Sequence, residues 1–154
     1  MRRLHQEAAG EIRFLHGEIA EGRFQRGLAM AAAVFAVLNG GEAYFEHLRG
    51  SFSQRWMWTP VWLSPIMAGA GAGAYFSPTI ARRVLPLVSL VTLVEGAVGF
   101  CLHLRGISRM AGHFRNLQFN ISLGPPLFAP LLFCSVGFLG LLASMMKRET
   151  GGDP

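Results

Sequence analysis

Four long stretches with almost no charge constrain what this chain can fold into. Residues 56–81 and 116–146 contain no Asp, Glu, Lys or Arg, residues 84–104 contain one acidic residue, and residues 27–48 contain two. A helix needs roughly 20 apolar residues to cross the hydrocarbon core of a bilayer. The apolar runs are continuous rather than alternating, which favours helices over strands. We therefore predict an all-α integral membrane four-helix bundle with spans at about 27–48, 60–81, 84–104 and 125–146.

The composition agrees with a membrane protein and excludes several other classes. Hydrophobic residues make up 51% of the chain and charged residues 15%, whereas a soluble domain is about a quarter charged. The chain is too apolar for intrinsic disorder, and its two cysteines are too few for a disulfide scaffold. No phosphate-binding loop, serine-hydrolase elbow or zinc-protease motif is visible in the sequence, so we expect a non-catalytic protein.

The segments outside the spans are short. Residues 1–26 are predicted to form an amphipathic helix that lies on the membrane interface, with docking on a partner protein as the alternative. Apolar residues recur there at helical spacing, at Leu4, Ala8, Ile12, Leu15 and Ile19. Residues 27–148 are then the four-helix transmembrane domain, and residues 149–154 are a short polar tail.

The second predicted span contains a run of alternating Ala and Gly at residues 68–74. Gly69 and Gly73 are four residues apart, which is the spacing that lets two helix backbones approach closely in a membrane. We expect both glycines to lie at a helix–helix contact. We identify no internal repeat in the sequence, and this argues against a transporter built from repeats.

Ionisable residues inside the predicted spans gather toward one end. Glu42 and Glu46 share a face of the first span, and Glu95 lies in the third span at a depth that differs from that of Glu42 by only about 5 Å. His47 and His103 each lie one residue before the end of these two spans. Because both spans run in the same direction, the topology predicts a carboxylate layer beneath a histidine layer near the outer face. Such residues usually face a bundle interior or a cavity.

Four kinds of site are compatible with these residues. A haem b could be held between His47 and His103. A quinone could bind at the same histidines, beside a carboxyl group that exchanges protons near neutrality. In a structural alternative, which we favour from the sequence alone, the acids pair with arginines of the outer loops. A metal ion would instead use carboxylate and imidazole ligands, namely Glu42, Glu46, Glu95 and His113.

These features together predict a small membrane subunit that supports a larger bacterial redox or energy-transducing complex. The alternative is a stand-alone b-type haem or quinone-reactive electron carrier. The expected partners are the lipid bilayer and other membrane subunits. Nucleic acid is not an expected partner, because the pI of about 10.2 follows from basic loops and no nucleic-acid-binding motif is visible.

The distribution of basic residues predicts a multi-pass protein of the inner membrane with both termini in the cytoplasm. Nine of the 14 Lys and Arg residues fall in segments that would then lie inside, and five fall in the outer loops, as the positive-inside rule requires. A reporter enzyme that is active only in the periplasm should be inactive when fused after Pro154 and active when inserted in the loop 49–59. The opposite pattern would contradict this topology.

Overall fold

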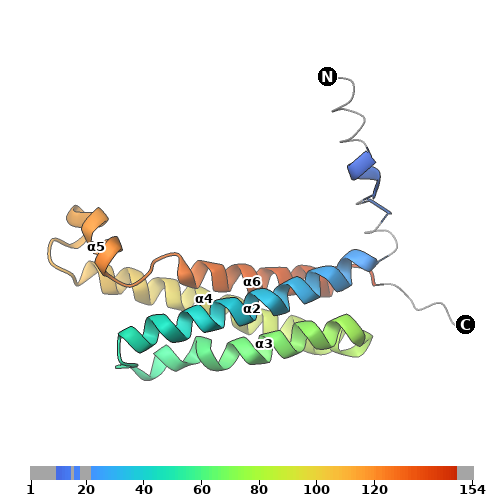
Figure 1. The fold of residues 1–154 in the computed structure, drawn as a ribbon, viewed down its shortest axis with the longest axis horizontal. Helices are drawn as coiled ribbons and strands as arrows, with labels where there is room; N and C mark the ends of the chain where they lie inside the picture. Colours follow the sequence, from blue (N-terminus) through green and yellow to red (C-terminus); the bar gives the residue numbers. More distant parts are fainter. Residues whose placement is uncertain (1–9, 15, 18–21, 149–154) are drawn as a thin grey trace, which may run out of the picture.

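The chain folds into helices joined by short loops (Figure 1). In the computed structural model, the described residues are 10–14, 16–17 and 22–148, and none of them lies in a strand, which confirms the all-α class. The long helices are α2 (Arg23–Arg49), α3 (Thr59–Phe76), α4 (Leu85–Ser108) and α6 (Ala129–Met145). The shorter elements are η1 (Arg55–Trp58), the π-helical η2 (Ile80–Val84) that continues into α4, η3 (His113–Asn116) and α5 (Leu117–Leu123).

The predicted interfacial helix over residues 1–26 is described only in part. Residues 10–14 and 16–17 are helical, and Ile12 is exposed. The other apolar residues that suggested this helix lie outside the described residues, namely Leu4, Ala8, Leu15 and Ile19. The predicted tail 149–154 lies outside them as well.

Two helical segments are long and apolar enough to cross a membrane, Arg23–Arg49 and Ile80–Ser108. They contain the predicted first and third spans. The other two long helices are shorter than their predicted spans, and proline explains both differences. Ser77 is extended ahead of Pro78, so α3 ends five residues before the predicted boundary. The double proline at 125–126 delays the start of α6 in the same way.

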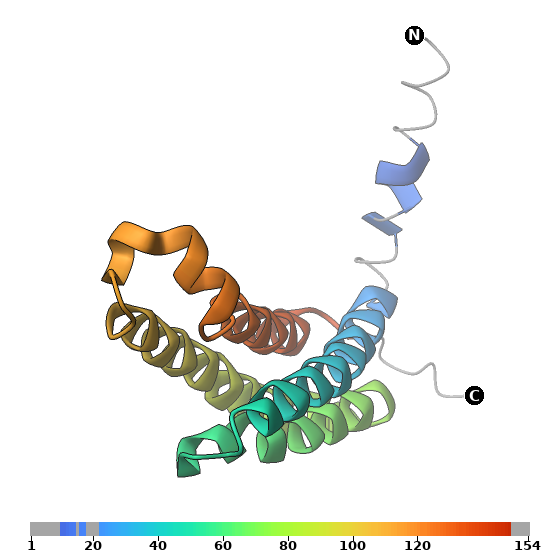
Figure 2. The same cartoon turned by 60° about the vertical axis from the view of Figure 1, so that its left-hand side comes forward.

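Successive long helices run in opposite directions, so α2 and α4 are parallel to each other (Figure 1). α2 packs along α3 to form a first helix pair, and α4 packs along α6 to form a second pair. The pairs meet where α2 lies against α6 and where α3 lies against α4 (Figure 2). α2 and α4 therefore occupy opposite corners of an up-and-down bundle.

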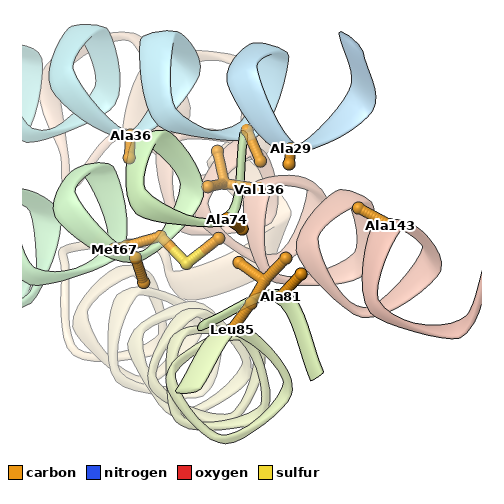
Figure 3. Packing of buried hydrophobic residues seen from close by; sticks show 10 residues of the cluster. Ala29, Ala36, Met67, Ala74, Ala81, Leu85, Val136 and Ala143 are labelled. Atoms are coloured by element: carbon orange, nitrogen blue, oxygen red, sulfur yellow. The ribbon is translucent and has the colours of Figure 1, made fainter. Parts of the chain in front are cut away.

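The two pairs share a core at the end of the bundle where α2 begins and α6 ends, which we call the closed end (Figure 3). Its buried side chains are mostly alanines from α2, α3, η2 and α6, with Met67, Leu85 and Val136 as the largest apolar members. Large apolar side chains instead face outward, and Val37 and Phe45 are 61% and 65% exposed. Small residues inside and large apolar residues outside are typical of helices that pack within lipid.

Glycines bring the helix backbones together within each pair. In the first pair, a Cβ atom added at Gly71 of α3 would lie 2.6 Å from the carbonyl oxygen of Ala29 in α2. In the second pair, a Cβ atom added at Gly96 of α4 would lie 2.6 Å from the carbonyl oxygen of Pro130 in α6. Neither position has room for a side chain, so each pair depends on a seam of close backbone contact.

The expected helix contact at Gly69 requires correction, whereas Gly73 does lie against a neighbouring helical segment, η2. A Cβ atom at Gly69 would have no neighbour within 4 Å, and one at Gly73 would meet the flexible side chain of Ile80 at 3.0 Å. The residue of this Ala–Gly run that contacts α2 is Gly71, which lies on a different face of the helix. Because the run is small on every side, the four-residue spacing did not identify the face that packs.

A buried arginine joins three chain segments at the closed end. Arg148 is only 6% exposed, and its guanidinium donates hydrogen bonds to the carbonyl oxygens of Ala74 and Tyr75. These carbonyls belong to the last turn of α3, where helical partners are missing. Arg148 also donates to the side-chain oxygen of Gln25 in α2, at 3.2 Å. It therefore ties the end of α6 to the start of α2 and the end of α3.

The two glycines of α3 provide a matched test of the first seam. Gly71→Leu should lower the free energy of unfolding in detergent by about 1–3 kcal/mol or more, because an added side chain forces α2 and α3 apart. Gly69→Leu, an identical change on the open face, should stay within about 0.5 kcal/mol of the unchanged protein. Thermal or denaturant unfolding followed by circular dichroism measures both. A Gly69→Leu protein less stable than Gly71→Leu would contradict the seam.

Candidate ligand pocket

A pocket of about 1130 Å³ lies at the end of the bundle opposite the shared core, which we call the open end. Its walls come from the second half of α2, the part of α4 from Leu90 onward, and the first turns of α3 and α6. Residues 121–126, at the end of α5 and in the loop after it, complete the lining. Binding sites for small molecules and cofactors run from about 300 to 1000 Å³ and are mainly apolar. The pocket is slightly larger than that range and is mainly apolar, which suits a large ligand.

The turn after α2 places η1 at the edge of this pocket. Ser51 and Phe52 both adopt a left-handed backbone conformation, with φ of 54° and 44°, and reverse the chain within a few residues. The ring of Phe52 then stacks on Trp58, with the centroids 4.0 Å apart. This stack holds η1 in place, and Trp56 and Met57 of η1 line the pocket.

Most of the polar residues predicted from the sequence meet in this pocket. Its lining includes both expected histidines and all three expected carboxylates, namely His47, His103, Glu42, Glu46 and Glu95. The expectation that they share one end of the bundle therefore agrees with the structure. His113 is not part of the lining. The left-handed backbone of Gly112 and His113 turns the chain after α4, and the His113 ring contacts the carbonyl oxygen of Ser108.

The two pocket histidines face each other although α2 and α4 lie at opposite corners of the bundle. Their ring centroids are 6.5 Å apart, and the ring planes are inclined at 89°. The Nδ1 atom of His103 lies 2.8 Å from the carbonyl oxygen of Pro126. Because a carbonyl oxygen only accepts, this contact places the proton on Nδ1 and leaves Nε2 with a free lone pair. The Nδ1 atom of His47 is buried and has no hydrogen-bond partner among the described residues.

The carboxylates have different surroundings. Glu95 accepts a hydrogen bond of 3.0 Å from the hydroxyl group of Thr59, the first residue of α3. Glu46 forms an ion pair with Arg49, three residues further along α2. Pairing with an outer-loop arginine, which the structural alternative predicted for the acids, is thus observed for Glu46. Glu42 is exposed at the side of the pocket.

The predicted metal site gains no support from the geometry. Across residues 10–14, 16–17 and 22–148, no three side chains of His, Cys, Asp or Glu lie close enough together to hold a metal ion. The pocket instead presents two imidazoles from opposite helices.

Comparing the two helix pairs reveals an internal repeat that the sequence interpretation missed. Residues 26–50 align without a gap to residues 82–106, and both segments end in the same four residues, His-Leu-Arg-Gly. The alignment also matches Gly40 with Gly96, and each of these glycines contacts the second helix of its own pair. The next helices share one feature, because Pro60 and Pro130 are each the second residue of their helix, α3 and α6 respectively.

The repeat places His47 and His103 at equivalent positions, so the shared His-Leu-Arg-Gly motif is a sequence signal that links the two histidines. Six of the 25 aligned positions are identical, and four of these six form the motif. No family model, curated protein or solved structure matches the chain.

Proposed function

We propose that all four long helices cross the bacterial inner membrane, with both termini in the cytoplasm and the open end toward the outer face. At 1.5 Å per residue, the 18 residues of α3 and the 17 of α6 span about 27 and 26 Å, close to the hydrocarbon thickness of about 30 Å. Since α3 packs along α2 and α6 packs along α4, they share the depth of the two longer helices. Slight local thinning of the bilayer accommodates the remaining mismatch.

The outer surface of the bundle supports a lipid environment. Large apolar side chains are exposed on every long helix, including Leu38 at 60%, Ile66 at 56%, Val91 at 55% and Phe138 at 55%. Soluble monomers rarely expose contiguous apolar patches larger than a few hundred Å². A bilayer, or the apolar surface of other membrane subunits, would cover these side chains and remove the free-energy cost of exposing them to water.

The pocket supports a binding function. Its large apolar walls and its group of histidines and carboxylates suit a bulky apolar molecule with one polar or coordinating centre. The observation that carries this proposal is the meeting of His47, His103 and Glu95 inside a pocket of about 1130 Å³. Quinones and haem b both belong to this ligand class.

A subunit of a larger redox or energy-transducing complex is the setting that we propose for this binding function. Electron transfer through a single bound cofactor needs a donor and an acceptor outside the site, so other membrane components must dock nearby. A stand-alone electron carrier is the alternative. Purification from native membranes in mild detergent, followed by mass spectrometry, separates the two, because only a subunit remains with defined membrane partners.

A pair of phenylalanine substitutions tests whether the pocket is occupied in the cell. Ala43→Phe fills a position that lines the pocket, so the molecule that copurifies with the protein should fall by at least about tenfold, a loss of roughly 1.4 kcal/mol in binding. Val37→Phe places the same side chain on the exposed face of α2 and should leave binding unchanged. Extraction of the purified proteins and mass spectrometry of the extract measures both.

Equal amounts of the copurifying molecule in the two variants would contradict the pocket as its binding site. An empty extract from the unchanged protein would contradict the binding function altogether.

A further inference from the structure

We infer that the pocket binds one b-type haem, with His47 and His103 as the two axial ligands, on a pseudo-twofold axis that relates two copies of a helix pair. This inference rests on the proposed binding function and names its ligand. It is carried by the repeat, by the geometry of the two rings and by the hydrogen bonding of their nitrogens.

Two hydrogen bonds between the pairs join helices that the pseudo-twofold axis exchanges. Asn39 and Glu95 occupy equivalent positions of the repeat. Asn39 of α2 donates to the carbonyl oxygen of Leu132 in α6, at 3.4 Å, and Glu95 of α4 accepts from Thr59 in α3, at 3.0 Å. Exchanging the two pairs turns α2 into α4 and α6 into α3, so the two bonds join corresponding pairs of helices. They do not join corresponding residues, because Thr59 is the first residue of α3 and Leu132 is the fourth residue of α6. The axis therefore runs along the bundle, between the pairs.

Equivalent residues on a twofold axis face each other at equal depth, and His47 and His103 do so. An iron that binds two imidazole nitrogens at about 2.0 Å each places these nitrogens about 4 Å apart, by the usual metal–imidazole distance. Each ring centroid lies farther from the iron than the nitrogen that binds it, so the expected distance between the centroids is larger than the distance between the nitrogens. The observed centroid distance of 6.5 Å is compatible with this arrangement. One imidazole from each of two helices is the ligand set of a b-type haem.

The surroundings of the rings fit iron ligation. A metal-bound histidine usually donates its other ring N–H to a carbonyl or carboxylate, which fixes the orientation of the ring. The contact between His103 Nδ1 and the carbonyl oxygen of Pro126 is of this kind. The Nδ1 atom of His47 is buried without a hydrogen-bond partner within the described part of the chain, so no protein group competes with iron for that nitrogen. The two rings would then bind through different nitrogens, Nδ1 of His47 and Nε2 of His103, so the twofold relation holds for the residues and not for the ligating atoms.

The rest of the pocket suits the macrocycle. Val94, Val98 and Phe133 provide apolar walls. Arg49 also lines the pocket, and it would have to exchange its ion pair with Glu46 for one with a propionate group. A bound haem would supply one-electron transfer. A quinone could form hydrogen bonds with the same polar groups but would not need two imidazoles as ligands, so the experiment below must distinguish a bound quinone from a bound haem.

The test uses the full-length protein in detergent, loaded with haem and followed by absorbance. We expect one haem per chain, with the low-spin spectrum of two histidine ligands when reduced. His47→Ala and His103→Ala should each abolish the low-spin spectrum and weaken haem binding by at least about tenfold. His113→Ala is the matched control, because His113 lies outside the pocket, and it should leave the spectrum unchanged.

Free imidazole separates a lost ligand from a lost fold. Added to the His103→Ala protein, it should restore the low-spin spectrum, because it can replace the missing ring on the iron. A low-spin spectrum that persists in both alanine variants overturns the axial assignment. So does a variant that regains no low-spin spectrum with imidazole while it keeps the helical content and unfolding temperature of the unchanged protein.

A protein that binds no haem but copurifies with another molecule, such as a quinone, that Ala43→Phe displaces overturns the haem inference alone. The proposed binding function then stands. A protein that retains neither haem nor any other molecule in the pocket overturns both.

Discussion

Close backbone contact at two glycine seams determines how this bundle is built. Within a membrane there is no hydrophobic force between helices, so association depends on van der Waals packing and on small residues that allow it. Gly71 meets Ala29 in one pair, and Gly96 meets Pro130 in the other. Each seam fixes two antiparallel helices as a unit, and the fold consists of two such units side by side.

The two units are joined firmly at one end and loosely at the other. At the closed end, alanines from both units interlock, and Arg148 links the last turn of α3 to the start of α2. At the open end the units are linked by the hydrogen bonds of Asn39 and Glu95 and by the facing rings of the two histidines. The space left between the units is the pocket, so the same packing that builds the fold also creates the site.

Much of this arrangement could be predicted from the sequence. The uncharged stretches located all four long helices, and the helical spacing of Glu42, Glu46 and Glu95 placed the acids with the histidines at one end. Depth along a helix depends only on residue number and direction, which is why that part of the site could be located from residue positions alone.

The remaining features depend on which way helix faces and side chains point, and residue spacing alone does not determine this. The Ala–Gly run is small on all sides, so the sequence did not identify Gly71 as the residue in contact. His113 is turned away by two left-handed residues, of which Gly112 is a usual sequence signal for this conformation and His113 itself is not. Arg148 binds carbonyls that are free only because α3 ends at Phe76. The repeat was hidden because only six of its 25 aligned positions are identical.

Hydrogen exchange of the full chain in lipid nanodiscs would test the two-ended bundle directly. If the structure is correct, amides of residues 29–36 and 136–143 at the closed end exchange more slowly than those of residues 42–50 and 99–106 around the pocket. Adding haem then slows exchange around the pocket and leaves the closed end unchanged. Equal protection at both ends, or faster exchange at the closed end, would contradict a bundle that is packed at one end and open at the other.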